Sequence, residues 1–309
     1  MRPVVQYIAK GRIQGVATAT TLATLAPLFF PFYWPSGAVI GLFTLRYGSG
    51  EGAVLLAITS SIYLVMTWLL FKSTAFGLGM LISVWLPVYG LCCVLRMTRS
   101  QGMSLTLAGI VAAMLVVAFH VGVDDAVAWW QPRLDLFFQV LAERIQVSNT
   151  SDLLAQREVL VTMLAPVMTG VILTGILFSA VIMMLLARWC HAILDNPGGF
   201  AKEFRNLRLD GRFALVMVAF TILALLTKTW FTGLATELLA VVMVLLFFQG
   251  LAVVHSIVAK KSLRVGWLGA MYLLWLLATP QVTIVIVFIG LVDATVDIRA
   301  RLFNISGPT

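Results

Sequence analysis

Two ionisable residues fall in apolar stretches, where an unpaired charge is costly and a functional role is expected. Glu237 lies near the start of the stretch Thr232–Ile257, and His120 lies near the end of the stretch Met103–Val123. Asp125 follows His120 at a spacing that would let an acid orient a histidine base. No phosphate-binding partner follows nearby, so we interpret this pair as the end of a helix that meets water.

The sequence carries no recognisable catalytic constellation. It lacks the HExxH, Gly-x-Ser-x-Gly and Asp-rich diphosphate motifs, and Gly48-Ser-Gly50-Glu-Gly52 lacks the Lys-Ser/Thr of a phosphate-binding loop. The cysteines Cys92, Cys93 and Cys190 have no zinc-binding spacing. We therefore expect a protein that is not an enzyme and that binds no metal and no cofactor.

Composition places these residues in a membrane protein. Of 309 residues, 61% are hydrophobic and only 11% are charged, and the mean hydropathy is +1.01. These values exclude a soluble globular fold. We predict an all-α fold, a polytopic transmembrane helical bundle in which residues 1–309 form a single integral membrane domain. The net charge of +8 then marks cytoplasmic loops, so the expected partner is the lipid bilayer and not nucleic acid.

Apolar runs between the charges predict about eight to ten membrane segments. The ten candidates are Ile13–Phe30, Ser36–Leu45, Gly52–Phe71, Ala75–Leu95, Met103–Val123, Leu160–Trp189, Phe213–Leu226, Thr232–Ile257, Val265–Ala278 and Val282–Val296. Two of them, Ser36–Leu45 and Val265–Ala278, are shorter than the roughly 20 residues that span a bilayer, and prolines interrupt the chain beside both. These two span only if they are extended, tilted or buried among other helices.

The distribution of basic residues predicts the orientation. Suppose that all ten segments cross and that the N-terminus is inside. Only Lys72, Arg133, Arg144, Arg157 and Lys228 of the 21 Lys and Arg residues then lie outside. Because cytoplasmic loops are enriched in Lys and Arg, we predict a multi-pass protein with both termini cytoplasmic.

Two loops are long enough to hold helices of their own. Residues 124–158 form an external loop that is predicted to contain an amphipathic helix, because apolar residues recur at helical spacing: Leu134, Phe137, Phe138, Leu141 and Ile145. Residues 190–212 form a basic cytoplasmic loop with an apolar stripe of Phe200, Phe204 and Leu207. The stripe predicts an interfacial helix on the anionic inner leaflet, which we favour over a docking helix for a partner.

Several polar and aromatic residues fall at the external ends of their segments under this orientation. We predict an outward-facing ligand site in which a carboxylate and an imidazole orient a small polar or cationic ligand and aromatic rings cover it. Its residues are Glu237, His120, Asp124, Trp129, Trp130, Tyr33 and Trp34. The alternative is the aromatic belt and acidic rim that are common at membrane interfaces.

Small residues at four-residue spacing predict close helix packing near the N-terminus. They are Gly15, Ala19 and Ala23 in the first segment and Gly37 and Gly41 in the second. Spacing does not distinguish packing within the chain from docking of another membrane subunit or self-association.

Three stretches resemble the uncharacterised YybS-like family of bacterial membrane proteins: Pro35–Gly48, Phe204–Leu209 and Gly290–Arg299. They match that family's proline and Arg-x-Gly turn, its internal basic loop and its Gly-x-x-Asp…Asp-x-Arg ending, although Asp210 stands where a proline is expected. The family is distantly similar to substrate-binding subunits of energy-coupling-factor vitamin transporters and to the rod-shape protein MreD. The resemblance implies a helical bundle of the bacterial cytoplasmic (inner) membrane without chemistry of its own. In the last stretch, Asp297 and Arg301 stand one helical turn apart, which predicts a structural ion pair.

Two function classes remain open. The first is a non-catalytic transport or substrate-capture subunit resembling the vitamin-transporter substrate-binding components. The alternative is a membrane scaffold or assembly factor that binds other membrane proteins. No Walker motif is present, so an ATP-driven step would need a separate ATPase.

Overall fold

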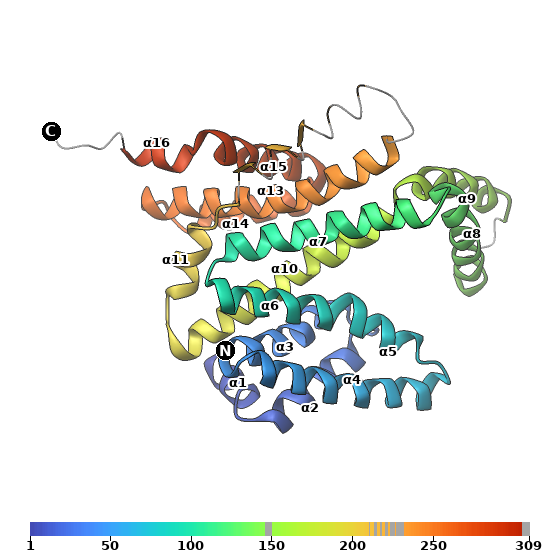
Figure 1. Cartoon of the computed structure of the whole chain (residues 1–309), viewed down its shortest axis with the longest axis horizontal. Coiled ribbons are helices and arrows are strands. Elements are labelled where there is room, and N and C mark those ends of the chain that lie inside the picture. Colours follow the sequence, from blue (N-terminus) through green and yellow to red (C-terminus); the bar gives the residue numbers. More distant parts are fainter. Residues whose placement is uncertain are drawn as a thin grey trace. The chain divides into compact units, whose positions relative to one another are not determined.

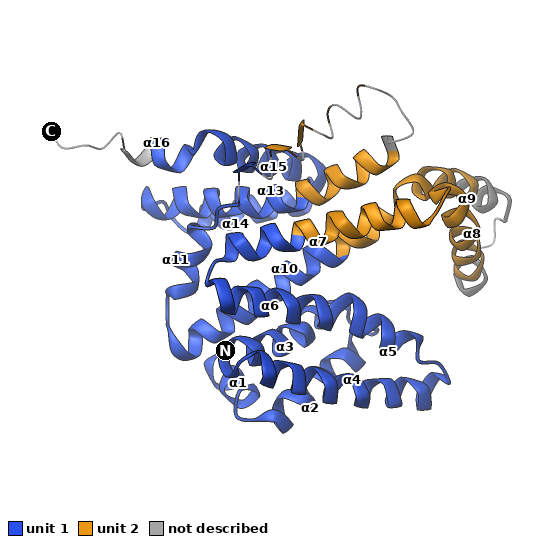
Figure 2. Cartoon of the chain, viewed as in Figure 1, with its two compact units in different colours: residues 1–108, 176–214, 244–309 blue, residues 109–175, 215–243 orange. Residues whose placement is uncertain are grey.

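The computed structural model describes residues 1–145, 150–209 and 232–304, together with a few positions between 211 and 226. All regular structure in these residues is helical, which confirms the all-α prediction (Figure 1). Contacts divide the chain into two compact units (Figure 2). Unit 1 comprises residues 1–108, 176–214 and 244–309, and unit 2 comprises residues 109–175 and 215–243.

Six helical stretches among the described residues are long and apolar enough to cross a membrane. They are Ser49–Phe71, Ala75–Thr98, Gln101–Gly122, Arg157–Asp195, Gly233–Lys260 and Thr279–Val296, and each corresponds to one of the ten predicted segments. The prediction of eight to ten segments is therefore somewhat higher than the number described. Two of the other candidates, Ser36–Leu45 and Val265–Ala278, form shorter helices, and the helix of Ile13–Phe30 ends at Leu25. Most of Phe213–Leu226 lies outside the described residues.

The N-terminal part of unit 1 is built around one short, buried helix. It contains α1 (Arg2–Ile8), α2 (Arg12–Leu25), α3 (Tyr33–Tyr47), α4 (Ser49–Phe71), α5 (Ala75–Met80) and α6 (Leu86–Thr98). Helix α3 packs against α2, α4 and α6 (Figure 1), and every residue from Ser36 to Leu45 is buried. At 1.5 Å per residue its length is only ~22 Å. Helix α3 is therefore a core helix that is too short to cross a bilayer alone.

The small residues of α2 and α3 lie at close contacts within unit 1. Ala19 and Ala23 are buried, and a Cβ on Gly15 would lie 2.6 Å from a phenyl ring of α3. A Cβ on Gly37 or Gly41 would overlap side chains of α10 (Met168–Asp195). The structure thus places both small-residue faces in packing between helices of this chain.

The C-terminal part of unit 1 has a second close crossing. Its helices are α11 (Gly199–Arg205), the later part of α13 (Thr232–Lys260), α14 (Gly266–Leu277), α15 (Thr279–Val296) and α16 (Ile298–Asn304), with the start of α7 (Gln101–Gly122) and most of α10. A Cβ on Gly250 of α13 would overlap the backbone of α15, and one on Gly290 of α15 would overlap the backbone of α13. Gly290, the first residue of the Gly-x-x-Asp ending, therefore allows two membrane helices to approach closely.

Arg299 joins the two stretches Phe204–Leu209 and Gly290–Arg299, which are distant in sequence. Its guanidinium donates to the Asp293 carboxylate at 2.7 Å and to the carbonyl oxygens of Arg205 at 2.7 Å and Leu207 at 2.8 Å. The Arg299 side chain is 5% exposed and the Asp293 side chain 1% exposed. Buried charges need such pairing and hydrogen bonding to be tolerated. The paired charges therefore hold the stretch Phe204–Leu209 against the end of α15.

Gln249 of α13 extends this buried network. Its amide nitrogen donates to Asp293 at 2.9 Å, and its amide oxygen accepts from the Leu209 backbone amide at 3.2 Å. Gln249 is 1% exposed, so both ends of its side chain need partners.

The predicted pair of Asp297 with Arg301 is wrong. Helix α15 ends at Val296, and Asp297 precedes α16, where its carboxylate accepts from the Ala300 amide at 3.1 Å. This amide and the Arg208 guanidinium occupy both oxygens of the Asp297 carboxylate. Asp297 forms its ion pair with Arg208, at 2.7 and 2.8 Å.

Unit 2 contains the later part of α7, α8 (Ala126–Ile145), α9 (Thr150–Leu164) and the first residues of α10 and α13. Helices α8 and α9 pack together, since Leu134 is buried against Val161 and Ala165. Arg157 and Asp135 add an ion pair of 2.8 Å. The segment 124–158 therefore contains α8 and the start of α9 where one amphipathic helix was predicted, and its external position on the membrane surface stays a prediction.

Candidate functional site

Glu237 lies near the start of α13 and is only 2% exposed. Helix α10 starts at Met168 in the same unit, and its first turn packs against the Glu237 side chain at Gly170. First-turn amides have no partner within their own helix, so a carboxylate is stabilised there. Gly170 makes room for this contact, since a Cβ there would lie 2.7 Å from the Glu237 Cβ.

His120 of α7 is the second ionisable group beside this carboxylate. Its Nδ1 lies 3.7 Å from Glu237 Oε2 and 3.1 Å from the carbonyl oxygen of Val116. Because a carbonyl oxygen only accepts, Nδ1 carries the proton in that contact. Among the described residues, the buried Oε2 of Glu237 has no hydrogen-bond partner. A ligand donor or a cation at this oxygen would satisfy it.

A cluster of aromatic side chains lies beside His120. Trp129 and Trp130 of α8 contact each other edge to face at 4.6 Å between ring centroids, and Phe119 contacts both of them and His120. The Trp130 indole donates to Thr169 Oγ1 at 2.8 Å, in the first turn of α10. Four of the seven predicted site residues therefore lie in one part of unit 2.

The other predicted residues have different surroundings. Asp124 is exposed in the turn between α7 and α8, and its neighbour Asp125 accepts from the Ala128 amide at 3.0 Å. Asp125 thus caps α8, which agrees with the interpretation as a helix end. Tyr33 and Trp34 belong to unit 1, at the start of α3, and their part in the site stays a prediction.

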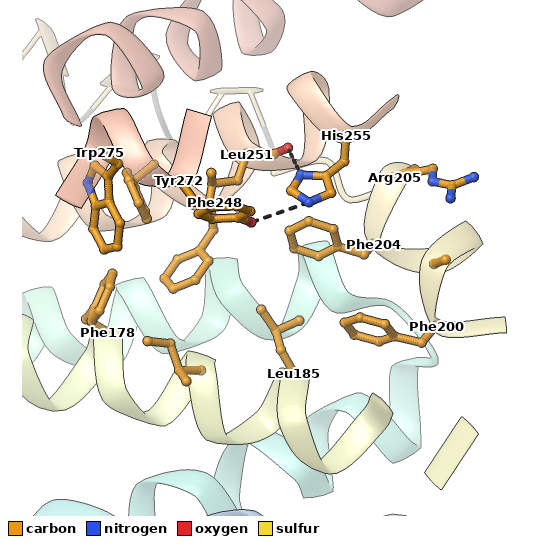
Figure 3. Close-up of a pocket in the computed structure, with 13 residues that line it drawn as sticks. Phe178, Leu185, Phe200, Phe204, Arg205, Phe248, Leu251, His255, Tyr272 and Trp275 are labelled. Atoms are coloured by element: carbon orange, nitrogen blue, oxygen red, sulfur yellow. Dashed lines mark hydrogen bonds between the residues drawn. The ribbon is translucent and has the colours of Figure 1, made fainter. Parts of the chain in front are cut away.

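Unit 1 contains an aromatic pocket that the sequence analysis missed. Its volume is about 370 Å³, within the roughly 300–1,000 Å³ of small-molecule sites. Figure 3 shows aromatic rings of α10, α11, α13 and α14 around a common space. The side chains that define the pocket are Phe178 and Leu185 of α10, Phe200, Phe204 and Arg205 of α11, Phe247, Phe248, Leu251 and His255 of α13, and Tyr272 and Trp275 of α14.

His255 and Tyr272 supply hydrogen-bonding groups in a wall that is otherwise apolar except for Arg205. His255 Nδ1 lies 2.8 Å from the Leu251 carbonyl oxygen, and His255 Nε2 lies 3.3 Å from the Tyr272 hydroxyl (Figure 3). The carbonyl requires a proton on Nδ1, so in the neutral ring Nε2 accepts from the hydroxyl. The Tyr272 oxygen then keeps acceptor capacity for a ligand donor.

Helix α11 closes one side of the aromatic pocket. The Phe200 and Phe204 rings stack at 5.9 Å, and Phe204 contacts the His255 ring edge to face at 5.3 Å. Two residues of the stripe that the sequence predicted for the inner leaflet, Phe200 and Phe204, therefore line a protein pocket, whereas Leu207 lies beyond the end of α11. The sequence signal was present on α13, where Phe248, Leu251 and His255 share one helical face, but such a face has the same spacing as ordinary core packing.

No group of three or more His, Cys, Asp or Glu side chains that could hold a metal ion occurs in the described part of the chain. The arrangement of Glu237 with His120 is suited to hold a cation or a hydrogen-bond donor, and the aromatic pocket is suited to hold an apolar molecule with one polar group.

Apolar helices of spanning length define the class, a polytopic helical membrane protein. Comparison with known families agrees: residues 16–294 match the model described as "Predicted membrane protein (DUF2232)", and the chain belongs to that family. No curated protein and no solved structure matches the chain.

Proposed function

We propose that this protein is a non-catalytic membrane subunit that captures a small, largely apolar ligand carrying one polar group. The aromatic pocket carries this proposal, because its size and its rings suit such a molecule. The Tyr272 hydroxyl, held by His255, would bind the polar group and set the ligand's orientation.

The packing of the small residues favours capture over the alternative, a scaffold or assembly factor. The scaffold proposal needs faces of close approach that are free for partners. Gly15 and Ala19 of α2, and Gly37 and Gly41 of α3, lie against helices of this chain. The sequence feature that suggested docking is therefore explained by internal packing.

A role comparable to the substrate-binding subunits of vitamin transporters is part of the same proposal. It rests on the sequence resemblance, and a separate ATPase would supply any ATP-driven step. We also propose a bacterial inner-membrane location with both termini cytoplasmic, on the distribution of Lys and Arg. In a cysteine-free background, single cysteines at Gln131 and Ser262 should react with an impermeant reagent from opposite faces. Reaction of both from one face would refute the orientation.

The pocket is tested by filling it. Leu185→Trp places a larger side chain in the pocket wall, whereas Leu273→Trp makes the same change at an exposed position of α14. Each variant and the unmodified protein are purified from native membranes, extracted with organic solvent and compared by mass spectrometry. We expect a compound that co-purifies with the unmodified protein and with Leu273→Trp but falls at least tenfold with Leu185→Trp.

A conservative variant adds a test of the polar contact. Tyr272→Phe keeps the ring and removes the hydroxyl, so retention of the compound should fall about two- to tenfold, the value of one hydrogen bond. The capture proposal fails if the same compounds in the same amounts accompany all the variants.

We propose a second, polar site at Glu237 for a small cationic or hydrogen-bond-donating group. The unpartnered, buried Oε2 beside His120 supports it. Unfolding temperatures are compared in sodium, potassium and N-methylglucamine chloride at equal ionic strength. A cation-specific stabilisation should be lost in Glu237→Gln and kept in Glu158→Gln, which alters an exposed carboxylate. If no salt distinguishes these proteins, Glu237 serves only to hold the start of α10.

A further inference from the structure

A second cavity of unit 1 has basic walls. It has a volume of about 480 Å³ and lies where α6 ends beside the last turns of α10 and the helix α11. Arg96 and Arg99, with Arg188 and His191, line it together with Glu203 and two leucines. The aromatic pocket does not include these residues, so this basic cavity is a separate feature.

The acidic groups near the basic cavity are already paired. Glu203 forms an ion pair with Arg188, whose Nε lies 2.8 Å from Oε2. The carboxylate of Asp195 lies 3.3 Å from His191 and 3.5 Å from Arg46. Among the described residues, two carboxylates thus face four guanidinium groups, counting Arg46 together with those that line the cavity. The cavity therefore has an excess of positive charge.

Arg188 provides an independent sign that a ligand is accommodated here. Its side chain is 12% exposed, and its Nη1 is buried without a hydrogen-bond partner among the described residues. A buried guanidinium N–H without an acceptor is costly, and such groups normally have one. An anion in the cavity would supply the acceptor.

Phosphate is the anion whose geometry fits these groups. Guanidinium groups present paired N–H donors that match two phosphate oxygens, and the charge-assisted hydrogen bonds are stronger than neutral ones. Arg96 also donates to the Leu45 carbonyl oxygen at 2.5 Å, which fixes one guanidinium at the wall. We propose that the basic cavity binds a phosphate group, supplied by a lipid headgroup or by a free phosphate compound.

The experiment has two arms that distinguish these sources. In the first arm, native mass spectrometry measures adducts of the detergent-solubilised full chain with phosphatidylglycerol and with phosphatidylcholine, whose headgroup has no net charge. In the second arm, unfolding temperature is measured in inorganic phosphate and in chloride at equal ionic strength. Both arms use Arg99→Gln, which changes an exposed residue of the cavity, and Arg264→Gln, which changes an exposed basic residue elsewhere in unit 1.

If the cavity binds a lipid headgroup, phosphatidylglycerol adducts should form in preference to phosphatidylcholine adducts. Phosphatidylglycerol should then bind Arg99→Gln about tenfold more weakly, which is the loss expected for one charge-assisted hydrogen bond. A free-phosphate site predicts stabilisation by phosphate that Arg99→Gln weakens. Arg188→Lys, which keeps the charge but lacks the forked donors, should weaken binding in either case. The proposal is overturned if no phosphate probe distinguishes Arg99→Gln from the unmodified protein. It is equally overturned if Arg264→Gln loses as much binding, because the cluster then acts only as a general basic surface.

Discussion

Removal of the Asp293 carboxylate should destabilise the protein strongly, because it isolates a buried positive charge. Asp293→Ala leaves the Arg299 guanidinium with only backbone carbonyl oxygens as acceptors, and it removes the acceptor of the Gln249 amide. Breaking a buried ion pair by deleting one partner costs about 3–5 kcal/mol. We expect a loss of that order in the free energy of unfolding.

The assay is denaturant unfolding of the purified protein in mixed micelles, with Asp297→Asn as the matched control. Asp297 lies four residues further along, but its pair with Arg208 is exposed, with side-chain exposures of 40% and 53%. An exposed pair contributes at most about 1 kcal/mol. The double variant Asp293→Leu/Arg299→Leu should recover part of the loss, because no charge is then left unpaired. The reasoning is refuted if Asp293→Ala costs no more stability than Asp297→Asn. It is also refuted if the double variant loses as much stability as the sum of the losses from the Leu substitution at Asp293 alone and at Arg299 alone.

Two other predictions concern stability. Gly170→Ala should cost about 1–3 kcal/mol, because the added methyl group crowds the Glu237 side chain. Gly175→Ala in the same helix should be neutral or slightly stabilising, because a Cβ at that position would have no neighbour within 4 Å. Thermal unfolding compares the two variants, and equal effects would contradict the close contact at Gly170. Partial burial alone would raise the pKa of Asp297, but the Ala300 amide and the Arg208 guanidinium lower it below its usual 3.8. A depressed pKa stabilises the folded state above the unfolded-state pKa, and the contribution is lost as the pH falls through the folded-state pKa. Arg208→Gln should therefore lower the unfolding temperature slightly near neutral pH, with the difference fading below about pH 4; a difference that grows on acidification would contradict this.

The membrane-spanning helices were predictable because they follow from composition and length alone. Each of the six long helices contains a run of apolar residues uninterrupted by charge, and such a run has few alternatives in a polytopic protein. The short segment Ser36–Leu45 was harder to assign, since length excludes spanning but does not identify what covers the helix. Its complete burial among α2, α4 and α6 depends on contacts that are distant in sequence.

The candidate sites were predictable only in part. Glu237 and His120 were identified because ionisable residues at membrane depth are rare, and the structure brings them within 3.7 Å. The aromatic pocket was not identified, because Phe248 and Phe204 have the spacing of ordinary packing faces. The pairing of Arg299 with Asp293 was missed because the chain turns at Asp297, and a helical spacing rule does not apply across that turn.

The most direct test of the capture proposal is an experimental structure of the protein purified from its native membrane, determined beside the Leu185→Trp variant. The proposal predicts density for one defined non-protein molecule between Phe248 and Tyr272, with its polar group at the Tyr272 hydroxyl, and no such density in the variant. A pocket that is closed by its own side chains, or that holds only the tails of bulk lipids in both proteins, would contradict it.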